Sequence, residues 1–137
     1  MLLTTTVCRV CSPEGYEPNA RVVNEAMRTA LESGTEVTIL NDPDAAVDGA
    51  DAIYTDVWAS MGQEDEIEER NGVFAPYQVD EALMAKAKPG ALFLHCLPAH
   101  RGQEVTQEVL DGPQSVVYDI AENRLHVQKA LLALLIR

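Results

Sequence analysis

The chain has 137 residues, of which 47% are hydrophobic and 23% are charged, as expected for one globular domain with a buried core. Its net charge of −12, from 22 acidic and 10 basic residues, argues against nucleic-acid binding, which needs clustered Lys and Arg. The longest apolar run, residues 130–136, is too short to cross a membrane, and the first residues lack the basic flank of a signal peptide. We therefore expect a cytoplasmic protein with a single domain over residues 1–137.

The acidity itself has two explanations. One is a well-solvated surface, on which like charges favour solubility over compactness. The other is adaptation to high salt, where counter-ions screen the repulsion between carboxylates. The small number of lysines, which are Lys86, Lys88 and Lys129, fits the second explanation as well as the first.

Short β-branched runs alternate with helical stretches, a pattern typical of a parallel sheet with crossover helices. The expected strands are residues 7–11, 36–40, 52–56, 91–95 and 115–118. The expected helices are residues 19–33, 44–47, 79–87, 105–110 and 122–136, the first capped by Asn19 and ended by Gly34. The pattern predicts an α/β fold: a Rossmann-like, doubly wound parallel sheet of about five strands with helices on both faces.

The last expected helix is apolar nearly all round over residues 130–136. A helix of this kind is normally buried against another body, although a frayed apolar terminus explains the pattern equally simply. Before the first strand there is only a short stub. Both ends together predict that the domain packs against something the chain does not contain.

Cys8 and Cys11 form a Cys-x-x-Cys pattern, for which a redox or metal role has to be considered. Residues three apart on a strand face opposite sides, and no second cysteine pair is present to complete a zinc site. Three cysteines are also an odd number, which argues against a full disulfide framework. Two ordinary strand cysteines are the favoured interpretation.

Polar side chains follow the third expected strand. Asp56 lies where the strand ends and can pair with a cationic amine. Ser60 and Met61 can open a helical turn whose free amides bind a carboxylate. The segment therefore offers groups for both ends of a zwitterionic amino acid. The alternative is that Asp56 and Ser60 merely cap a helix.

The fourth expected strand leads into His95 and Cys96, with His100 shortly after. Side chains of adjacent residues diverge on an extended chain, so a catalytic dyad of His95 and Cys96 is disfavoured. A zinc site from these three residues lacks a fourth ligand at the usual spacing. Cys96 is better interpreted as a polar contact in a pocket than as a covalent nucleophile, and a small core residue is the alternative.

Arg124 follows the fifth expected strand, in the first turn of the last expected helix. The helix dipole disfavours a cation there, which hints at a functional role such as holding phosphate or a polarised carbonyl. An ordinary solvated arginine is the alternative. Because the carboxyl ends of parallel strands share one edge of the sheet, the three groups of polar residues predict a ligand pocket at that edge.

Three segments carry a resemblance to a known family. They are residues 56–62 (Asp-Val-Trp-Ala-Ser-Met-Gly), 95–102 (His-Cys-Leu-Pro-Ala-His-Arg-Gly) with Glu104 and Val105, and 122–126 (Glu-Asn-Arg-Leu-His). Over essentially its whole length the chain resembles the C-terminal, ornithine-binding domain of ornithine carbamoyltransferases. That family transfers a carbamoyl group from carbamoyl phosphate to the side-chain amine of ornithine, giving citrulline and phosphate. The resemblance implies a homo-oligomer (a trimer in the family), a place in arginine biosynthesis or breakdown, and no metal or other cofactor.

The resemblance also implies roles for single residues. Asp56 and Cys96 would contact the ornithine amine, while Ser60 and the Met61 amide would hold the amino-acid end. The amine must be deprotonated to attack, so Asp56 and Cys96 would orient it and manage its proton.

On the carbamoyl phosphate side, the resemblance implies contacts from the Leu97 backbone carbonyl and from Arg124. Arg124 would stabilise the charge that grows on the carbonyl oxygen in the transition state. The catalytic residues would then be Asp56, Cys96 and Arg124.

The chain also departs from the family. Family members are about twice this length and begin with a carbamoyl phosphate domain, whose Ser-Thr-Arg-Thr-Arg and His-Pro-x-Gln motifs are absent here, as is a Gly-Asp-x-Asn-Asn segment. We therefore expect an N-terminally truncated substrate domain, inactive without the other half. The alternative is a non-catalytic amino-acid-binding or interaction module that retains the fold.

Overall fold

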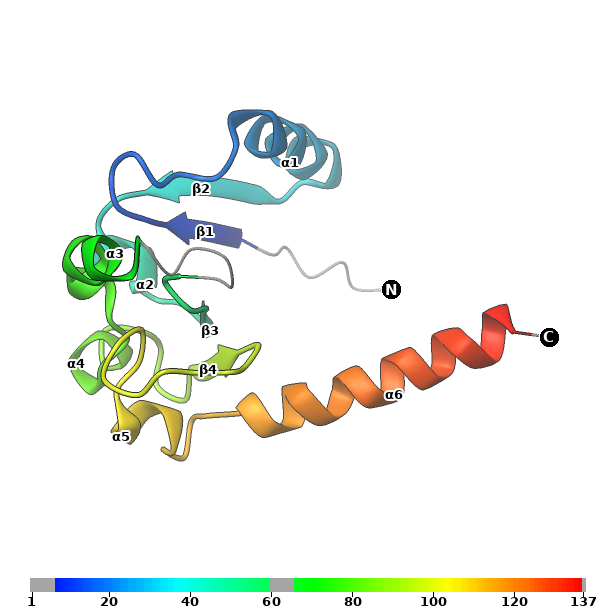
Figure 1. Ribbon diagram of the computed structural model, residues 1–137. Coiled ribbons are helices and arrows are strands. Elements are labelled where there is room, and N and C mark those ends of the chain that lie inside the picture. The colour runs from blue at the N-terminus through cyan, green and yellow to red at the C-terminus, as the bar shows by residue number, and fades with distance from the viewer. Residues whose placement is uncertain (1–6, 60–65, 137) are drawn as a thin grey trace. The chain divides into compact units, whose positions relative to one another are not determined.

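Residues 7–59 and 66–136 are described by the computed structural model of the chain (Figure 1). The backbone divides into two compact units, Met1–Ala46 and Val47–Arg137. The short helix α2 (Pro43–Val47) spans the division between them.

The first unit contains two parallel strands joined by a helix. Strand β1 (Val7–Cys11) pairs with β2 (Glu36–Leu40), so that Val7 lies opposite Glu36. Helix α1 (Ala20–Ser33) connects them and lies against β2 (Figure 1). The Asn19 side chain accepts a hydrogen bond from the Arg21 amide at 3.0 Å, and Gly34 ends the helix with a left-handed φ of 71°. The predicted helix, its cap and its stop are thus confirmed.

Cys8 and Cys11 on β1 are both free thiols. Cys8 is exposed, whereas Cys11 is half-buried, and burial together with the negative charge of Asp42 raises the pKa of the Cys11 thiol. A raised pKa keeps the thiol protonated and unreactive, which argues against a redox pair.

The second unit is built on another parallel pair. Strand β3 (Ala52–Thr55) pairs with β4 (Leu92–His95), which brings Thr55 opposite His95 where the two strands end. The remaining elements are α3 (Ile67–Phe74), the 3₁₀ helix η2 (Ala75–Tyr77), α4 (Glu81–Met84), α5 (Gln107–Leu110) and α6 (Val117–Leu135). The core gathers around Phe93 and Val105, both with no exposed surface.

The α/β class with parallel strands is confirmed, but the sheet differs from the prediction. In the described part of the chain the strands form two separate two-stranded sheets instead of one sheet of about five strands. The expected strand at 115–118 is reduced to a single bridge between Phe93 and Ser115, because α6 begins at Val117. The Val116 amide still donates to the Phe93 carbonyl at 3.0 Å, but the Val116 carbonyl already accepts the Ile120 amide at 3.0 Å in helical fashion, so the pairing goes no further.

Several helix boundaries also differ from those predicted. The helix expected at 79–87 is limited to α4, capped by Asp80, and it starts late because Val79 pairs with Val105 in a parallel bridge. The helix expected at 105–110 starts only at Gln107 for the same reason, with Thr106 as its cap. Helix α3 was not predicted, and α6 begins earlier than the expected residue 122.

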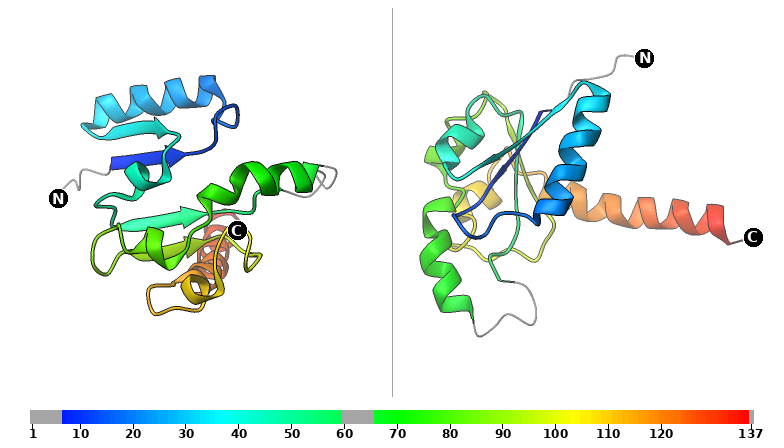
Figure 2. Two further views of the ribbon diagram at one scale, coloured as in Figure 1. Left: turned by 90° about the vertical axis from the view of Figure 1, so that its left-hand side faces the viewer. Right: turned by 90° about the horizontal axis from the view of Figure 1, so that it is seen from above.

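Helix α6 extends away from β3 and β4 (Figures 1 and 2). Its apolar side chains near the C-terminal end are exposed, with 51% to 78% of their surface accessible: Leu131, Leu132, Leu134, Leu135 and Ile136. Packing of this helix against a body outside the chain stays a prediction. Across the two described ranges, no helix combines the length and the apolar character that crossing a membrane requires.

Candidate functional site

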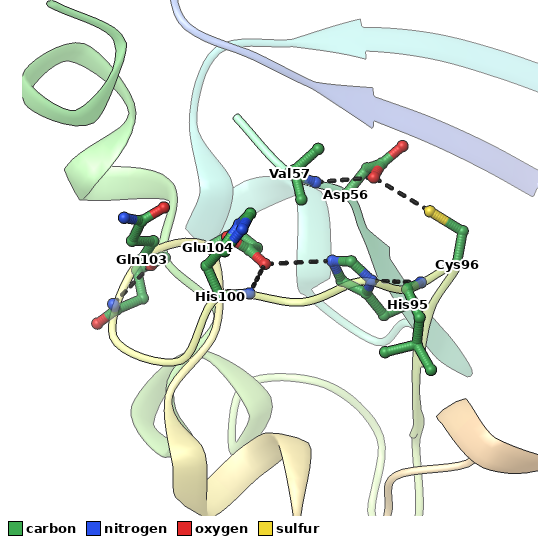
Figure 3. A network of polar contacts seen from close by, with 9 residues as sticks. Asp56, Val57, His95, Cys96, His100, Gln103 and Glu104 are labelled. Atoms are coloured by element: carbon green, nitrogen blue, oxygen red, sulfur yellow. Dashed lines mark hydrogen bonds and ion pairs between the residues drawn. The ribbon is translucent and has the colours of Figure 1, made fainter. Parts of the chain in front are cut away.

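The carboxyl ends of β3 and β4 bring two predicted site residues together (Figure 3). Asp56 directly follows β3 and Cys96 directly follows β4. The Cys96 thiol donates a hydrogen bond to Asp56 Oδ1 over 3.1 Å. The same oxygen accepts the Val57 amide at 2.8 Å, which fixes the carboxylate on its own backbone. Because neighbouring parallel strands end at one edge, residues 40 apart in the sequence become direct partners.

The Cys96 thiol is held in its protonated form. Burial raises its pKa most, and the hydrogen bond to Asp56 and the carboxylate's negative charge raise it further, while a hydrogen bond with Tyr54 acts in the opposite direction. A thiol with a raised pKa is a hydrogen-bond donor rather than a nucleophile at neutral pH. This supports the interpretation of Cys96 as a polar contact.

Tyr54 is a member of this site that the sequence reasoning missed. It lies on β3 with 59% of its surface exposed, and its phenol is close enough to Cys96 for the two groups to influence each other's pKa. Burial raises the pKa of Tyr54 most, followed by the effects of Cys96 and Asp56, whereas the charge of Arg124 lowers it. The sequence contained the information needed to find Tyr54. Residues two apart in an extended segment, such as Tyr54 and Asp56, face the same side.

Arg124 is within electrostatic reach of this group, since its charge acts on the Tyr54 phenol. Its place in the helix differs from the prediction. Because α6 begins at Val117, Arg124 lies about two turns inside the helix and not in its first turn. The argument from an unfavourable helix dipole was therefore wrong, because the dipole's effect is confined to the end turns. Ser60 and Met61 lie outside the described residues.

Behind the exposed group is a fully buried polar pair, His95 and Glu104, each with no exposed surface. The Leu97 amide donates to His95 Nδ1 at 2.8 Å, and His95 Nε2 lies 3.4 Å from Glu104 Oε1 (Figure 3). The same Glu104 oxygen accepts the His100 amide at 2.5 Å. Sequence reasoning named Glu104 only as part of the motif that carries the family resemblance and gave it no role.

Asp56, His95 and Cys96 present an oxygen, a nitrogen and a sulfur atom within 4.8 Å of one another, which is close enough for a metal ion. The imidazole does not fit that role as it is placed. His95 Nδ1 already accepts the Leu97 amide, and Nε2 faces Glu104. Without the imidazole only two ligands are left, whereas zinc sites use three or four protein ligands.

The sequence and the fold of the chain match a known family. The family model described as "Aspartate/ornithine carbamoyltransferase, Asp/Orn binding domain" matches residues 1–135, nearly the whole chain. The chain belongs to this family. Among curated relatives, the ornithine carbamoyltransferase of Pyrococcus abyssi is 60% identical over 127 residues, and that of Wolinella succinogenes is 58% identical over 129 residues. These alignments cover 93% and 94% of the chain.

Solved carbamoyltransferases have the same fold. The ornithine carbamoyltransferase of Pyrococcus furiosus aligns with 91% of the chain at 59% identity and a TM-score of 0.86. The anabolic enzyme of Campylobacter jejuni aligns with 93% of the chain at 36% identity and a TM-score of 0.88. The chain spans 40% of the length of the Pyrococcus abyssi protein and 42% of the Campylobacter jejuni chain.

Proposed function

We propose that this chain binds L-ornithine as the substrate domain of an ornithine carbamoyltransferase, in which a carbamoyl group passes from carbamoyl phosphate to the ornithine side-chain amine. The products are citrulline and phosphate. The observation that carries the proposal is the pairing of Asp56 with Cys96 at the ends of β3 and β4. Membership of the Asp/Orn-binding family supports the substrate class.

The chemistry of the pair suits an amine. The Asp56 carboxylate is exposed and accepts hydrogen bonds, so it attracts and orients the ammonium form of ornithine. The amine attacks only after losing a proton, and a carboxylate within hydrogen-bond reach guides that proton away. Cys96 stays a neutral thiol because its pKa is raised, and it contacts the amine without forming a covalent bond.

On the carbamoyl side we assign Arg124 and the Leu97 carbonyl. The guanidinium of Arg124 always carries a charge, and it would stabilise the developing negative charge on the carbonyl oxygen. Ser60 and the Met61 amide would hold the amino-acid end of ornithine, as the family resemblance implies. The place of this reaction in arginine biosynthesis fits the relative from Pyrococcus furiosus, which is named an anabolic ornithine carbamoyltransferase.

A second candidate function is amino-acid binding without carbamoyl transfer. The observation in its favour concerns Arg101, a further cation of the 95–102 motif. Its guanidinium is bound to Asp111 at 2.9 and 3.3 Å, which leaves it poorly placed to bind a phosphate. A homo-oligomeric state and a cytoplasmic location also stay predictions, and sedimentation velocity of the purified chain would test the first of them.

Calorimetric titration of the chain with L-ornithine tests the proposal. We expect measurable binding that weakens at least tenfold in Asp56→Asn, because a hydrogen bond to a charged group is worth about 1.5–3 kcal/mol. The matched control is Asp51→Asn, an exposed aspartate whose carboxylate is bound to Lys88 at 2.7 Å. Equal ornithine affinity in both variants would falsify the site assignment. A carbamoyl transfer assay on the chain supplemented with the carbamoyl phosphate-binding domain of a related ornithine carbamoyltransferase separates the two candidate functions, since citrulline forms only in the first.

A further inference from the structure

We propose that Glu104 is a positioning residue, which holds His95 in the tautomer that anchors the Leu97 backbone beside the substrate site. The proposal deepens the proposed function and rests on it, because it explains how Cys96 and the Leu97 carbonyl are kept in place. Glu104 does not contact the substrate and acts only through His95.

The tautomer of His95 follows from its contacts. Nδ1 accepts the Leu97 amide at 2.8 Å, so this nitrogen carries no proton and the ring is the neutral form with its proton on Nε2. That Nε2–H lies 3.4 Å from Glu104 Oε1. Among the described residues this buried nitrogen has no hydrogen-bond partner, so the contact with the Glu104 carboxyl is electrostatic and is the interaction that stabilises the buried N–H.

The backbone of Leu97 needs such an anchor. Its φ of 58° lies in the left-handed region, which is unfavourable for a residue other than glycine because the Cβ atom comes too close to the following carbonyl oxygen. A conformation of this kind persists only when its surroundings hold it. The hydrogen bond from the Leu97 amide to His95 provides that hold, and Cys96 lies between the two residues it joins.

Glu104 is itself fixed at the other end of the same loop. Its Oε1 accepts the His100 amide at 2.5 Å, and its Oε2 lies 3.7 Å from His100 Nδ1. The carboxyl group therefore ties residues 95–97 to residue 100 from inside the protein. A glutamate that is completely buried does not serve to solvate the surface. A positioning role explains why this one is buried.

Nuclear magnetic resonance on the ¹⁵N-labelled 137-residue chain tests the proposal directly. Long-range proton–nitrogen correlations at neutral pH should show His95 with the proton on Nε2. The exposed His126 gives an internal comparison, and loss of signals in His95→Asn assigns the ring. A proton on Nδ1 of His95 in the wild-type chain overturns the proposal without any variant at all.

Two substitutions at Glu104 separate positioning from mere stability. Glu104→Met removes the acceptor at similar size, and we expect a changed His95 tautomer, about tenfold faster hydrogen exchange at the Leu97 amide, and about tenfold weaker ornithine binding. Glu104→Gln keeps an acceptor oxygen and should stay within about threefold of the wild type in both measurements. Glu108→Met is the matched control, since Glu108 is exposed on α5.

The outcomes are distinct. An unchanged tautomer and Leu97 exchange rate in Glu104→Met, or a Glu104→Gln variant as impaired as Glu104→Met, contradicts the positioning role. Should Glu104→Met fail to fold, the wild-type tautomer and Glu104→Gln still decide. If the wild-type chain binds no ornithine, the proposed function fails, while the tautomer and exchange measurements still judge the contact between Glu104 and His95.

Discussion

The two sides of the β4 strand end differ sharply in environment. On the inner side, His95 and Glu104 are completely buried and bind the backbone of their own loop. On the outer side, Cys96 meets Asp56 and Tyr54, both largely exposed. The same segment therefore has buried structural contacts on one side and the candidate ligand-binding side chains on the other. The difference predicts that changes on the inner side alter stability and geometry, whereas changes on the outer side alter reactivity and ligand binding.

The largest expected effect comes from the core beneath the site. Phe93 on β4 has no exposed surface, so Phe93→Ala leaves a cavity and should destabilise the chain by about 3–5 kcal/mol. The neighbouring Leu92, with 43% of its surface exposed, provides the control, and Leu92→Ala should cost far less. Urea unfolding followed by circular dichroism measures both. Similar losses for the two variants would contradict the division into inner and outer sides.

A second prediction concerns the reactivity of the outer thiol. The Asp56 carboxylate is among the causes that raise the pKa of Cys96, after burial, so Asp56→Asn should lower that pKa. More thiolate is then present at a given pH, and alkylation by iodoacetamide at pH 8 should become severalfold faster. Peptide mass spectrometry separates Cys96 from Cys8 and Cys11. The Asp51→Asn variant should leave the rate unchanged, and an equal acceleration there would point to overall charge instead.

Tyr54 should act on the same thiol with the opposite sign. Its hydrogen bond lowers the pKa of Cys96, so Tyr54→Phe should raise that pKa and slow alkylation at pH 8. The change should be smaller than that of Asp56→Asn, because the phenol is neutral at this pH. Tyr118→Phe, at an exposed tyrosine on α6, is the control. A faster reaction in Tyr54→Phe would show that the phenol shields the thiol and does not stabilise its thiolate.

The smallest effect is expected at His100. Its side chain is 51% exposed and lies 3.7 Å from Glu104 Oε2, so the contact is screened by solvent. His100→Ala keeps the backbone amide that Glu104 binds and should cost less than about 1 kcal/mol in the free energy of unfolding. Thermal unfolding at pH 7 measures this. A loss of stability as large as that of Phe93→Ala would contradict this prediction and show that His100 stabilises the fold as the buried inner residues do.

Much of the local structure was predictable from the residues themselves. The α1 helix was found with its cap and stop, because Asn19 and Gly34 have strong positional preferences that need no tertiary contact. The strands β1 to β4 were placed within a residue or two for a similar reason, since β-branched runs are a local signal. The start of α4 was not predictable locally, because the bridge between Val79 and Val105 joins distant segments.

The candidate site, too, was only partly predictable from the sequence. The sequence by itself determined the α/β class, the family and the polar groups at the strand ends, because residue type and spacing carry that information. Only the tertiary structure decided that Cys96 bonds Asp56, that Tyr54 joins them, and that Glu104 is buried against His95. These pairings depend on which parallel strands lie side by side and on where a loop returns. Both depend on long-range packing, which the local sequence around each residue does not indicate.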